Sequence, residues 1–330
     1  MTDVSELSED GRGGGSLLTE RLPKYSIIVV NYNGGQLLLN CLESVFQHTN
    51  DFELILVDNN SSDHSVPQAV ARFPQIALVR NETNLGFANA NNGGLRRVRG
   101  QWIVLLNPDT LVTNNWLDHL VQSGVSSGAG IVAPKLLRLD GQTIDSTGLV
   151  FDLKTGLSHD RGSGAADRGQ FDQEELIPCC GFACAAIRRE VIHMIGVLDQ
   201  KMILYFEDID YCIRARIAGW PILYCPRSVV LHARSGVTPR SFGRVQKWAV
   251  AYRLRIMLKC YGLRNAIRYG VLRVFHDFVS MLAGMKNNDL EYFLGYLRSP
   301  IWNLLNLPIS ERTLVQSTRK ISDDVLFISQ

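Results

Sequence analysis

A short turn, Asn107-Pro108-Asp109-Thr110, follows four apolar residues, Ile103 to Leu106, that have the pattern of a strand buried on both faces. Proline cannot continue a strand ladder, and Asn and Asp favour turns, so the strand ends abruptly at this point. The turn places the Asp109 carboxylate at the carboxyl end of a strand, where open α/β sheets bind their ligands. Asp109 could bind a divalent cation, bind a sugar hydroxyl, or cap the turn that follows.

A second acidic group, Glu207, Asp208 and Asp210, begins a segment with a helical pattern. Acids in a first turn suit the helix dipole, and Asp210 can pair with Arg214 four residues later, so a well-capped amphipathic helix is one interpretation. Asp208 would project from a different side and could face a cleft. The preceding Tyr205-Phe206 would make that cleft partly apolar, which raises the pKa of a carboxyl toward the working range of a general base.

His232 closes an apolar run that resembles a strand and is a candidate partner for Asp109. A carboxylate and an imidazole suit Mg²⁺ or Mn²⁺, with diphosphate oxygens completing the coordination. The alternative is a buried histidine that is hydrogen-bonded at a strand end. Asp58 could accept the N3–H of a uracil or thymine ring, and Tyr32 could stack on that ring. The alternatives are that Asp58 only forms a turn and that Tyr32 is an ordinary surface aromatic residue.

The elements that must position these residues alternate between strand and helix. We expect strands over 25–30, 52–57, 76–79 and 103–106, and helices over 37–46, 65–72 and 87–98. This order predicts right-handed βαβ crossovers and a doubly wound, mostly parallel sheet whose polar strand-end loops gather at one edge. There is no Gly-x-Gly-x-x-Gly and no Walker sequence, which argues against a dinucleotide dehydrogenase or a P-loop enzyme. The Gly- and Asp-rich residues 151–175 are expected to form a mobile loop over the site.

Composition narrows the class of protein. The chain has 330 residues, is 46% hydrophobic and carries a formal charge of +2. Ten Lys and Arg and no acids lie between Arg234 and Arg273, but no DNA- or RNA-binding motif accompanies them, so no nucleic-acid partner is expected. Seven cysteines, odd in number and mostly in apolar runs, indicate buried thiols in a reducing compartment. No signal peptide or spanning segment is recognisable, so we expect a cytoplasmic protein.

The segment from Ala266 to Met285 combines an apolar face with Arg264, Arg268 and Arg273 nearby. An interfacial helix on an anionic membrane surface would have this composition. A solvated helical face, packing against the core, and a homodimer contact are the alternatives. If the first interpretation holds, the protein is peripheral on the inner face of the cell membrane.

Taken in order, the motifs resemble those of the family 2 glycosyltransferases of the GT-A fold, especially the bacterial rhamnosyltransferase-like branch. They are Val30–Asn33, Val57–Asp63, Asn84–Phe87 with Asn91–Gly93, Asn107–Thr110, Gly181–Arg189, Tyr205–Gly219 and Tyr224–His232. The resemblance extends from about Tyr25 to Ser235. It implies a GT-A type, doubly wound sheet with a C-terminal helical appendage.

The resemblance also implies a role for each matching residue. Asp109 corresponds to the metal-binding last Asp of the family's Asp-x-Asp motif, and His232 to the second metal ligand. Asp208 corresponds to the catalytic base, and Glu207 lies beside it in the acceptor-binding region. The implied donor-binding residues are Asn31, Tyr32, Asn33, Asp58, Asn60, Asn84, Gly86, Asn91 and Asn107.

Two residues depart from the family pattern. Asn107 replaces the first Asp of the motif, and Asn91 stands where many relatives have an Arg near the donor phosphates. Both changes lower the local charge, so we expect weaker metal binding and a donor held by Asn hydrogen bonds. Because Asp109 is then the only carboxylate that this turn offers, metal and donor are expected to bind together.

The implied function is that of an inverting, metal-dependent glycosyltransferase in bacterial cell-surface polysaccharide synthesis. The donor would be a dTDP- or UDP-sugar, with dTDP-rhamnose as the best interpretation, and the acceptor a hydroxyl of a glycan or polyprenyl-linked glycan. The alternative is a non-catalytic nucleotide-sugar or glycan-binding module, which the base-like Asp208 disfavours. A sugar nucleotidyltransferase would need a Gly-rich loop followed by a basic residue, and Asn31–Gly35 lacks that pattern.

We expect three regions along the chain. Residues 1–22 form a disordered leader, because they are polar and Gly-rich. Residues 23–238 form the glycosyltransferase domain, with a nucleotide-binding part at about 23–112 and an acceptor part at about 113–238. Residues 239–330 form a basic, mainly helical C-terminal region.

Overall fold

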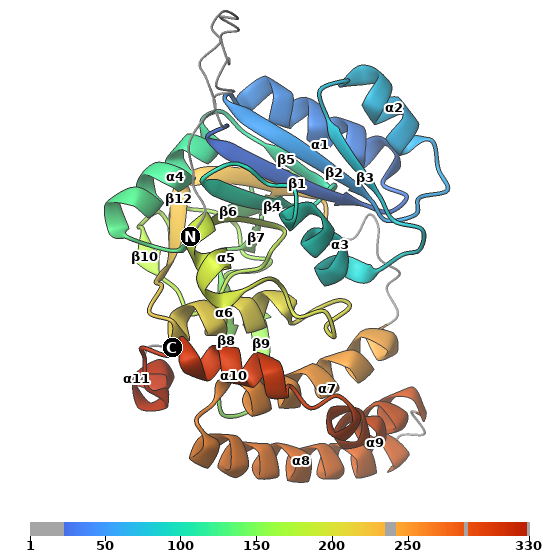
Figure 1. The fold of residues 1–330 in the computed structure, drawn as a ribbon, viewed down its shortest axis with the longest axis vertical. Helices are drawn as coiled ribbons and strands as arrows, with labels where there is room; N and C mark the ends of the chain where they lie inside the picture. The colour runs from blue at the N-terminus through green and yellow to red at the C-terminus, as the bar shows by residue number, and fades with distance from the viewer. Residues whose placement is uncertain (1–22, 235–241, 287–289, 329–330) are drawn as a thin grey trace, which may run out of the picture.

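A computed structural model describes residues 23–234, 242–286 and 290–328 (Figure 1). The predicted leader, residues 1–22, lies outside the described residues. Over the described ranges ten strands form one mixed sheet, and a further two form a small hairpin. Helices cover both faces of the sheet, and a C-terminal group of helices forms an additional layer below them in Figure 1. This arrangement confirms the predicted fold class.

The parallel half of the sheet contains the predicted βα units. Strand β1 (Tyr25–Asn31) lies between β2 (Phe52–Asp58) and β4 (Trp102–Leu106), and β3 (Ala77–Arg80) extends the sheet beyond β2. All three pairings are parallel, so the loops that follow these strands meet at one edge.

Successive residues of β1 enter two different cores, because side chains alternate along a strand. Ile27 and Val29 pack with α1 (Gly35–His48), α2 (Ser65–Arg72) and α4 (Trp116–Ser127). Ile28 packs with α3 (Gly86–Leu95), α5 (Arg189–Ile195) and α6 (Glu207–Ile217) on the opposite face. The continuous apolar character of the strand follows from this burial on both sides.

The second half of the sheet has mixed strand directions. Its strands are β5 (Thr110–Val112), β6 (Ile131–Arg138), β7 (Ile144–Ser146), β10 (Glu175–Leu176), β11 (Cys184–Arg188) and β12 (Ile222–His232). Strand β11 is antiparallel to both β4 and β6 and so joins the two halves. Strand β12 is parallel to β6 and, near its end, antiparallel to β5.

Residues 151–175 form less of a loop than we expected. Strands β8 (Leu149–Phe151) and β9 (Ser158–Asp160) form an antiparallel hairpin. Leu153, at its turn, is buried, and its carbonyl accepts a 2.5 Å hydrogen bond from the Tyr261 hydroxyl. The hairpin therefore contacts the C-terminal helices.

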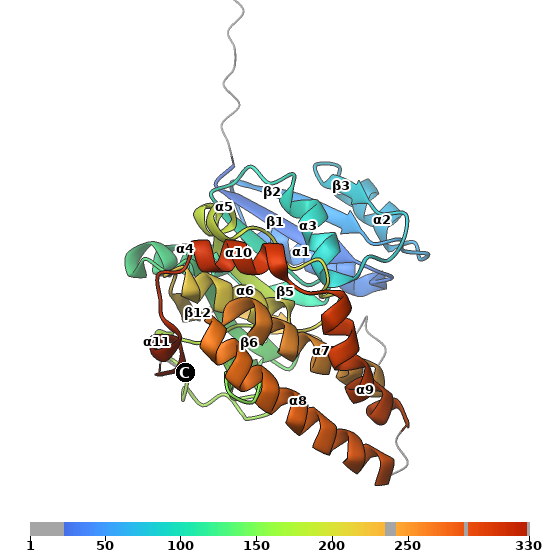
Figure 2. The same ribbon diagram turned by 60° about the horizontal axis from the view of Figure 1, so that its bottom comes forward.

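The C-terminal region consists of α7 (Phe242–Cys260), α8 (Leu263–Lys286), α9 (Leu290–Leu305), α10 (Ile309–Ser317) and α11 (Asp323–Ile328). Helices α8 and α9 form an outer layer, and α7 lies between α8 and the body (Figures 1 and 2). The chain then returns to the body, where Lys320 donates its backbone N–H to the Ile217 carbonyl at 2.8 Å. No described helix is both long and apolar enough to cross a membrane.

The basic segment does not form a uniformly exposed patch, because several of its cations are buried in ion pairs. Arg255 and Lys259 both contact Asp199, at 2.7 and 2.5 Å, and Lys259 also contacts Asp210 at 2.6 Å. Asp210 also makes the predicted pair with Arg214, at 2.9 Å. These contacts connect α7 to α6 and to the loop before it.

Arg273 is also buried, at 3% exposure, and pairs with Asp277 on the same helix. Of the three arginines that the interfacial-helix interpretation placed near the apolar face, Arg273 therefore packs inward instead, and Arg264 and Arg268 are exposed. The sequence could not show this, because an Arg–Asp pair four residues apart is compatible with either side of a helix.

Asp199→Ala should destabilise the protein by about 3–5 kcal/mol, because it leaves two buried cations without this carboxylate. Although burial alone would raise the pKa of Asp199, Lys259 and Arg255 hold it well below its ordinary value, so this contribution is lost only in strong acid. Urea denaturation at neutral pH measures the change in the free energy of unfolding.

A matched control is Glu43→Ala, which removes the partner of Arg72 in an exposed pair and should cost less than about 1 kcal/mol. Equal effects of the two variants would contradict a structural role for the Asp199 cluster.

Candidate active site

Asp109 and His232 are brought together by the pairing of β5 with β12. In the antiparallel register Thr110 lies opposite His232, and the backbone N–H of Ala233 donates to the Asp109 carbonyl at 3.0 Å. Asp109 Oδ1 and His232 Nε2 are then 3.3 Å apart, and both side chains are buried. Two residues separated by more than a hundred positions therefore share one site, as their types suggested.

Asp145 completes this group on the other side of the imidazole. His232 Nδ1 lies 2.8 Å from Asp145 Oδ2, and Asp145 Oδ1 is 2.9 Å from Arg234 and 3.3 Å from Arg138. Sequence reasoning missed Asp145, because one acid in the short segment Ile144–Ser146 has no distinguishing neighbour. Only the pairing of β7 with β6 shows its place beside His232.

The two carboxylates determine the protonation of the imidazole. Burial alone would lower the pKa of His232, but hydrogen bonds and charge attraction from Asp109 and Asp145 raise it to about 9. Conversely, although burial opposes it, His232 and Arg234 lower the pKa of Asp145. Without a cation, His232 is therefore positively charged at neutral pH.

The Asp109–His232 pair is suited to hold a divalent cation. Ligands at about 2.0–2.1 Å from one octahedral ion lie about 3 Å from each other, close to the observed 3.3 Å. A second carboxylate on the far imidazole nitrogen is the usual arrangement that orients a histidine ligand. No group of three or more His, Cys, Asp or Glu in the described ranges could hold a metal by itself. Further ligands would have to come from a bound molecule or from water.

Asp208 lies in the first turn of α6, directly after two residues in an unusual conformation. Tyr205 and Phe206 both have φ of 67°, a left-handed conformation that is strained for bulky side chains and that clusters at functional sites. Burial raises the pKa of Asp208 to about 7. Gly181 has no side chain to cover the carboxylate: a Cβ there would lie 3.8 Å from Asp208 Oδ2. Asp208 thus has the ionisation of a general base near neutral pH.

Glu207 is buried beside Asp208, and its Oε2 has no hydrogen-bond partner among the described residues. Burial and the neighbouring Asp208 charge raise the pKa of Glu207. A buried carboxyl oxygen without a partner is costly in a folded protein. A hydroxyl of a bound molecule would satisfy it.

Asp160 connects the two acidic groups. It pairs with Arg234, which also holds Asp145, and its charge contributes to the raised pKa of Asp208. The hairpin that carries Asp160 therefore lies between the His232 group and the first turn of α6. The predicted metal ligands, Asp109 and His232, and the predicted base, Asp208, therefore lie in one region of the molecule.

The loops after β1 and β2 are joined by asparagine side chains. Asn33 Oδ1 accepts hydrogen bonds from the Ser62 and Asp63 backbones at 2.7 and 3.3 Å. Asn31 is buried, and its amide donates to Ser61 and Ser65 at 3.0 and 3.1 Å. Its Oδ1 is buried as well and has no hydrogen-bond partner among the described residues. Asn31 therefore supports the loops from beneath, and its donor-binding role stays a prediction.

Asn59, which sequence reasoning did not select, joins the β2 loop to the loop before α3. Its amide donates to Asn84 Oδ1 at 2.8 Å, and its Oδ1 accepts from the Leu85 backbone at 2.9 Å. Gly86 has φ of 76°, and a Cβ there would lie 2.3 Å from the Ile203 carbonyl. Glycine is therefore required where α3 begins, and this requirement explains the Leu-Gly-Phe motif.

The remaining predicted donor residues lie at the same edge of the sheet. Asp58 accepts the Ser61 backbone N–H at 2.9 Å, as a turn-forming Asp does, while Tyr32 and Asn60 are exposed. Asn91 is buried, and its amide donates to the Phe87 carbonyl at 3.0 Å. Asn107 is partly buried, and its backbone N–H donates to the Ala183 carbonyl. Their roles stay predictions.

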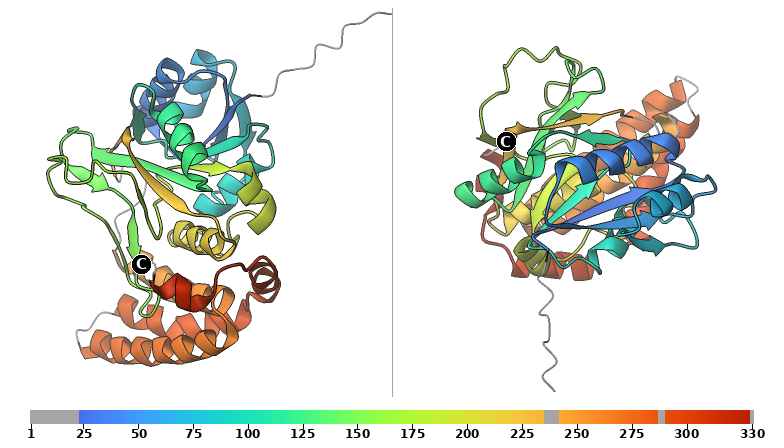
Figure 3. Two further views of the ribbon diagram at one scale, coloured as in Figure 1. Left: turned by 90° about the vertical axis from the view of Figure 1, so that its left-hand side faces the viewer. Right: turned by 90° about the horizontal axis from the view of Figure 1, so that it is seen from above.

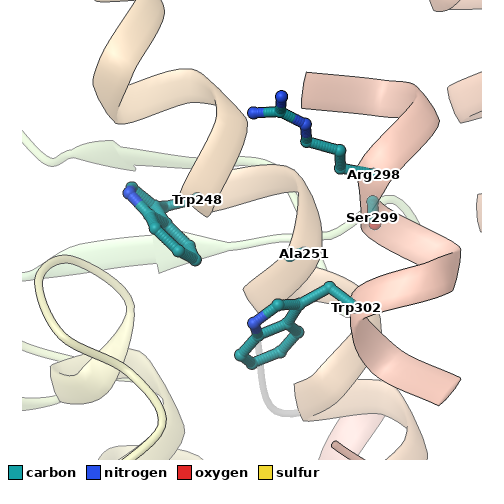
Figure 4. A pocket seen from close by; sticks show the side chains of 5 residues that line it. All are labelled: Trp248, Ala251, Arg298, Ser299 and Trp302. Carbon is teal, nitrogen blue, oxygen red and sulfur yellow. The ribbon is translucent and has the colours of Figure 1, made fainter. Parts of the chain in front are cut away.

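Two adjoining pockets lie near this region, the smaller between helices α7 and α9 and the larger between these helices and the loop before α3. The smaller, of about 140 Å³, is lined by Trp248, Ala251, Arg298, Ser299 and Trp302 (Figure 4). The larger, of about 380 Å³, shares the two tryptophans and also contacts Asn84 and Gln200. An aromatic wall followed by amide groups is suited to an amphipathic ligand or a sugar.

Comparison with known proteins adds to this geometry. The family model described as "Glycosyl transferase family 2" matches residues 26–196, just over half of the chain. The N-acetylglucosaminyl-diphospho-decaprenol L-rhamnosyltransferase of Mycobacterium tuberculosis is 27% identical over 246 residues, covering 68% of this chain and 79% of its own. An uncharacterized protein of Sinorhizobium fredii is 26% identical over 228 residues, and this match spans only 25% of that longer protein.

Similarity of structure extends further than similarity of sequence. The crystal structure of GalNAc-T7 with UDP, GalNAc and Mn²⁺ superposes with a TM-score of 0.59, over 87% of this chain and 58% of that one. Its sequence identity is 15%, so the likeness is one of fold.

In metal-free protein, the His232 imidazole should stay protonated at pH 7.5 and titrate near pH 9, because two carboxylates face it. Asp145→Asn should lower this pKa toward the ordinary value of about 6.5. Since the folded-state pKa is raised, the stabilisation is complete below about pH 6.5 and is lost as the pH rises through 9. NMR titration in the presence of a chelator measures the pKa, and His232→Gln assigns the signal. An unchanged pKa in Asp145→Asn would contradict the contact.

Proposed function

The chain belongs to glycosyl transferase family 2 and has the GT-A fold, and we propose that it is an inverting, metal-dependent glycosyltransferase acting in bacterial surface-glycan synthesis. The main support for this proposal is that two candidate metal ligands, Asp109 and His232, lie in the same region as a candidate general base, Asp208. In this proposal residues 23–112 bind the nucleotide and residues 113–238 hold the acceptor.

Asp109 and His232 would hold Mg²⁺ or Mn²⁺, and the ion, when bound, supplies positive charge to the departing diphosphate. Asp145 orients the imidazole, so that Nε2 points toward Asp109. With only two protein ligands, the site would need donor oxygens for tight binding. The Mn²⁺ and UDP in the GalNAc-T7 structure are consistent with such joint binding in this fold.

Asp208 would remove the proton of an acceptor hydroxyl while the oxygen of that hydroxyl attacks the anomeric carbon of the donor sugar. The new glycosidic bond forms on the face opposite the departing diphosphate, so the anomeric configuration inverts in one displacement. A carboxyl with a pKa of about 7 is largely ionised above that pH and remains basic enough to accept the proton. Glu207, whose Oε2 lacks a partner, would bind a neighbouring acceptor hydroxyl.

The donor loops would hold the nucleotide without a strongly cationic side chain at the Asn91 position. Tyr32 is exposed for stacking on a base, and Asn33 fixes the loop that carries it. We propose dTDP-rhamnose as the donor, because the rhamnosyltransferase-like motifs agree with the M. tuberculosis relative. The name of that relative also supports a polyprenyl-diphosphate-linked acceptor, and with it a position on the inner face of the cell membrane.

Assay against a panel of nucleotide-sugars, with wild type and Asp208→Asn, tests this function. Wild type should transfer from one donor, with dTDP-rhamnose expected. Asp208→Asn should lose about 10²–10⁴ in turnover while its donor affinity is retained, because a general base contributes about this factor. Donor binding without transfer or hydrolysis would favour a non-catalytic binding module.

The pH profile provides a control that folding defects cannot imitate. Because the pKa of Asp208 is raised and only the ionised form accepts a proton, kcat/KM of the wild type should rise through about pH 7 and level off above it. The residual activity of Asp208→Asn should lack this step. A near-wild-type rate in that variant would exclude Asp208 as the base.

Asp109→Ala should abolish the stimulation of donor binding by Mn²⁺, a loss of at least tenfold in affinity, or about 1.4 kcal/mol. Calorimetric titration of dTDP or UDP with and without Mn²⁺ measures it. Asn107→Asp, which adds a carboxylate to the same turn, is the matched variant and should strengthen the stimulation. Equal wild-type affinity with and without Mn²⁺ would contradict the metal role.

A further inference from the structure

Helix α8 exposes large apolar side chains on the side that a helix packed on a water-soluble domain ordinarily keeps polar. Its inward residues include the Arg273–Asp277 ion pair, which is buried. Its outward residues are large and apolar: Leu263, Ile267, Val271, Phe275, Phe278 and Leu282, between 47% and 69% exposed. At 100° per residue these side chains all lie within about 120° of one another. The exposed side of α8 is therefore a continuous apolar stripe.

Helix α9 repeats this pattern beside α8. Ser299 and Asn303 face inward and are buried, and the Asn303 amide donates to the Ala251 carbonyl of α7 at 2.9 Å. Leu297, Ile301, Leu304 and Leu305 are exposed, the last at 79%. We call these four and the six apolar residues of α8 the α8–α9 face. Exposed apolar clusters of this extent are uncommon on water-soluble monomers and mark interaction sites.

The charges within this face have one sign. Arg264 and Arg268 on α8 and Arg298 on α9 are exposed. Over the described side chains of the two helices, 263–282 and 293–305, Asp277 is the only acid, and it is buried against Arg273. Apolar side chains interspersed with arginines are the composition of a helix that lies in an anionic lipid interface. A symmetric dimer through the same face would instead bring arginines of two copies together, with no exposed acid among the described side chains of α8 and α9 to separate them.

The position of the face supports a membrane partner. Helices α8 and α9 lie at the end of the molecule opposite β2 and β3 (Figure 3, left). Arg298 and Trp302 border the apolar side of α9, and both line the smaller pocket with Trp248 (Figure 4). Tryptophan and arginine are suited to the boundary between lipid and water, because each has an apolar body and a polar end.

We propose that the α8–α9 face docks on an anionic lipid bilayer, with the helices lying in the plane of the surface and their apolar side chains at the boundary between the lipid headgroups and the acyl chains. This deepens the proposed function, since a polyprenyl-linked acceptor would lie in the same bilayer. The larger tryptophan-lined pocket, which reaches from Trp302 of α9 to Asn84, then lies between the α8–α9 face and the donor loops. Lipid binding itself does not require that any sugar be transferred.

Co-sedimentation of the full chain with vesicles tests the proposal. The wild type should sediment with vesicles that contain phosphatidylglycerol and much less with pure phosphatidylcholine. Phe275→Ser with Phe278→Ser should weaken binding at least tenfold, because both rings lose their apolar contact. Arg264→Gln with Arg268→Gln should weaken it about fivefold for each arginine at low salt, and less at high salt. Val125→Ser with Leu139→Ser is the matched control: both residues are exposed, at 61% and 48%, on other elements, and binding should not change.

Light scattering of the lipid-free protein tests the alternative, which is a dimer formed through the α8–α9 face. Binding to anionic vesicles that the phenylalanine variant retains would overturn the proposal, and so would a wild-type dimer that this variant dissociates. Unchanged thermal unfolding of the variants shows that they are folded.

A transfer assay in parallel separates the membrane contact from the proposed function. The phenylalanine variant should use a short-chain soluble acceptor as the wild type does and lose rate only on a vesicle-embedded one. Absence of transfer to either acceptor by the wild type, with sedimentation as expected, would contradict the proposed function but not the membrane contact.

Discussion

The antiparallel pairing of β5 with β12 is the interaction on which the candidate site depends. Strand β5 has only three residues, and it follows directly from the Asn-Pro-Asp turn. Its register against the end of β12 places Thr110 opposite His232, so Asp109 adjoins the imidazole. A shift by one residue would turn His232 to the other face of the sheet and separate it from Asp109. The short ladder thus determines whether the two side chains can share one cation.

The network around His232 extends this constraint into the rest of the site. Asp145 and Asp109 contact opposite sides of the ring, and Arg234 connects Asp145 to Asp160 on the β8–β9 hairpin. Their charges alternate, so removing one leaves a buried neighbour uncompensated. The hairpin in turn lies close enough to α6 for Asp160 to affect the pKa of Asp208. The metal-type and base-type groups are therefore electrostatically linked.

The sequence was sufficient for the parts of this structure that follow from local pattern. The four parallel strands are apolar runs, each followed by a polar loop, so β1 to β4 and the fold class could be predicted. Asp109, His232 and Asp208 could be selected because their residue types are those that metal binding and proton transfer require. Asp145 and Asn59 could not, because their contacts come from strand pairing and loop packing between distant segments.

The burial of individual side chains was the property that could be predicted least well from the sequence. Asn31 has the type and position of a ligand contact, yet the fold covers it with the loop that it supports. Arg255, Lys259 and Arg273 resemble surface cations, yet each is 3% exposed or less and paired with an acid that lies elsewhere in the sequence or on the same helix. Apolar residues of α8 would ordinarily predict a core-facing side, and here they face outward. Hydrophobic periodicity identifies a helical face without showing what covers it.

Helix α6 connects the candidate base, Asp208, to the helices that carry the exposed apolar α8–α9 face. Its first turn holds Asp208, while Asp210, two residues later, is buried against Lys259 of α7. Helix α7 packs against α8 and α9, whose outward sides are apolar. Lys259 also pairs with Asp199, and Asp210 with Arg214, so this contact belongs to a buried network of four charges. Separating the helices would disrupt that network, and α6 and the C-terminal helices are therefore expected to move as one body. A surface that positions α8 and α9 would therefore also position the proposed base, and this would relate the proposed membrane contact to the way in which the proposed acceptor meets Asp208.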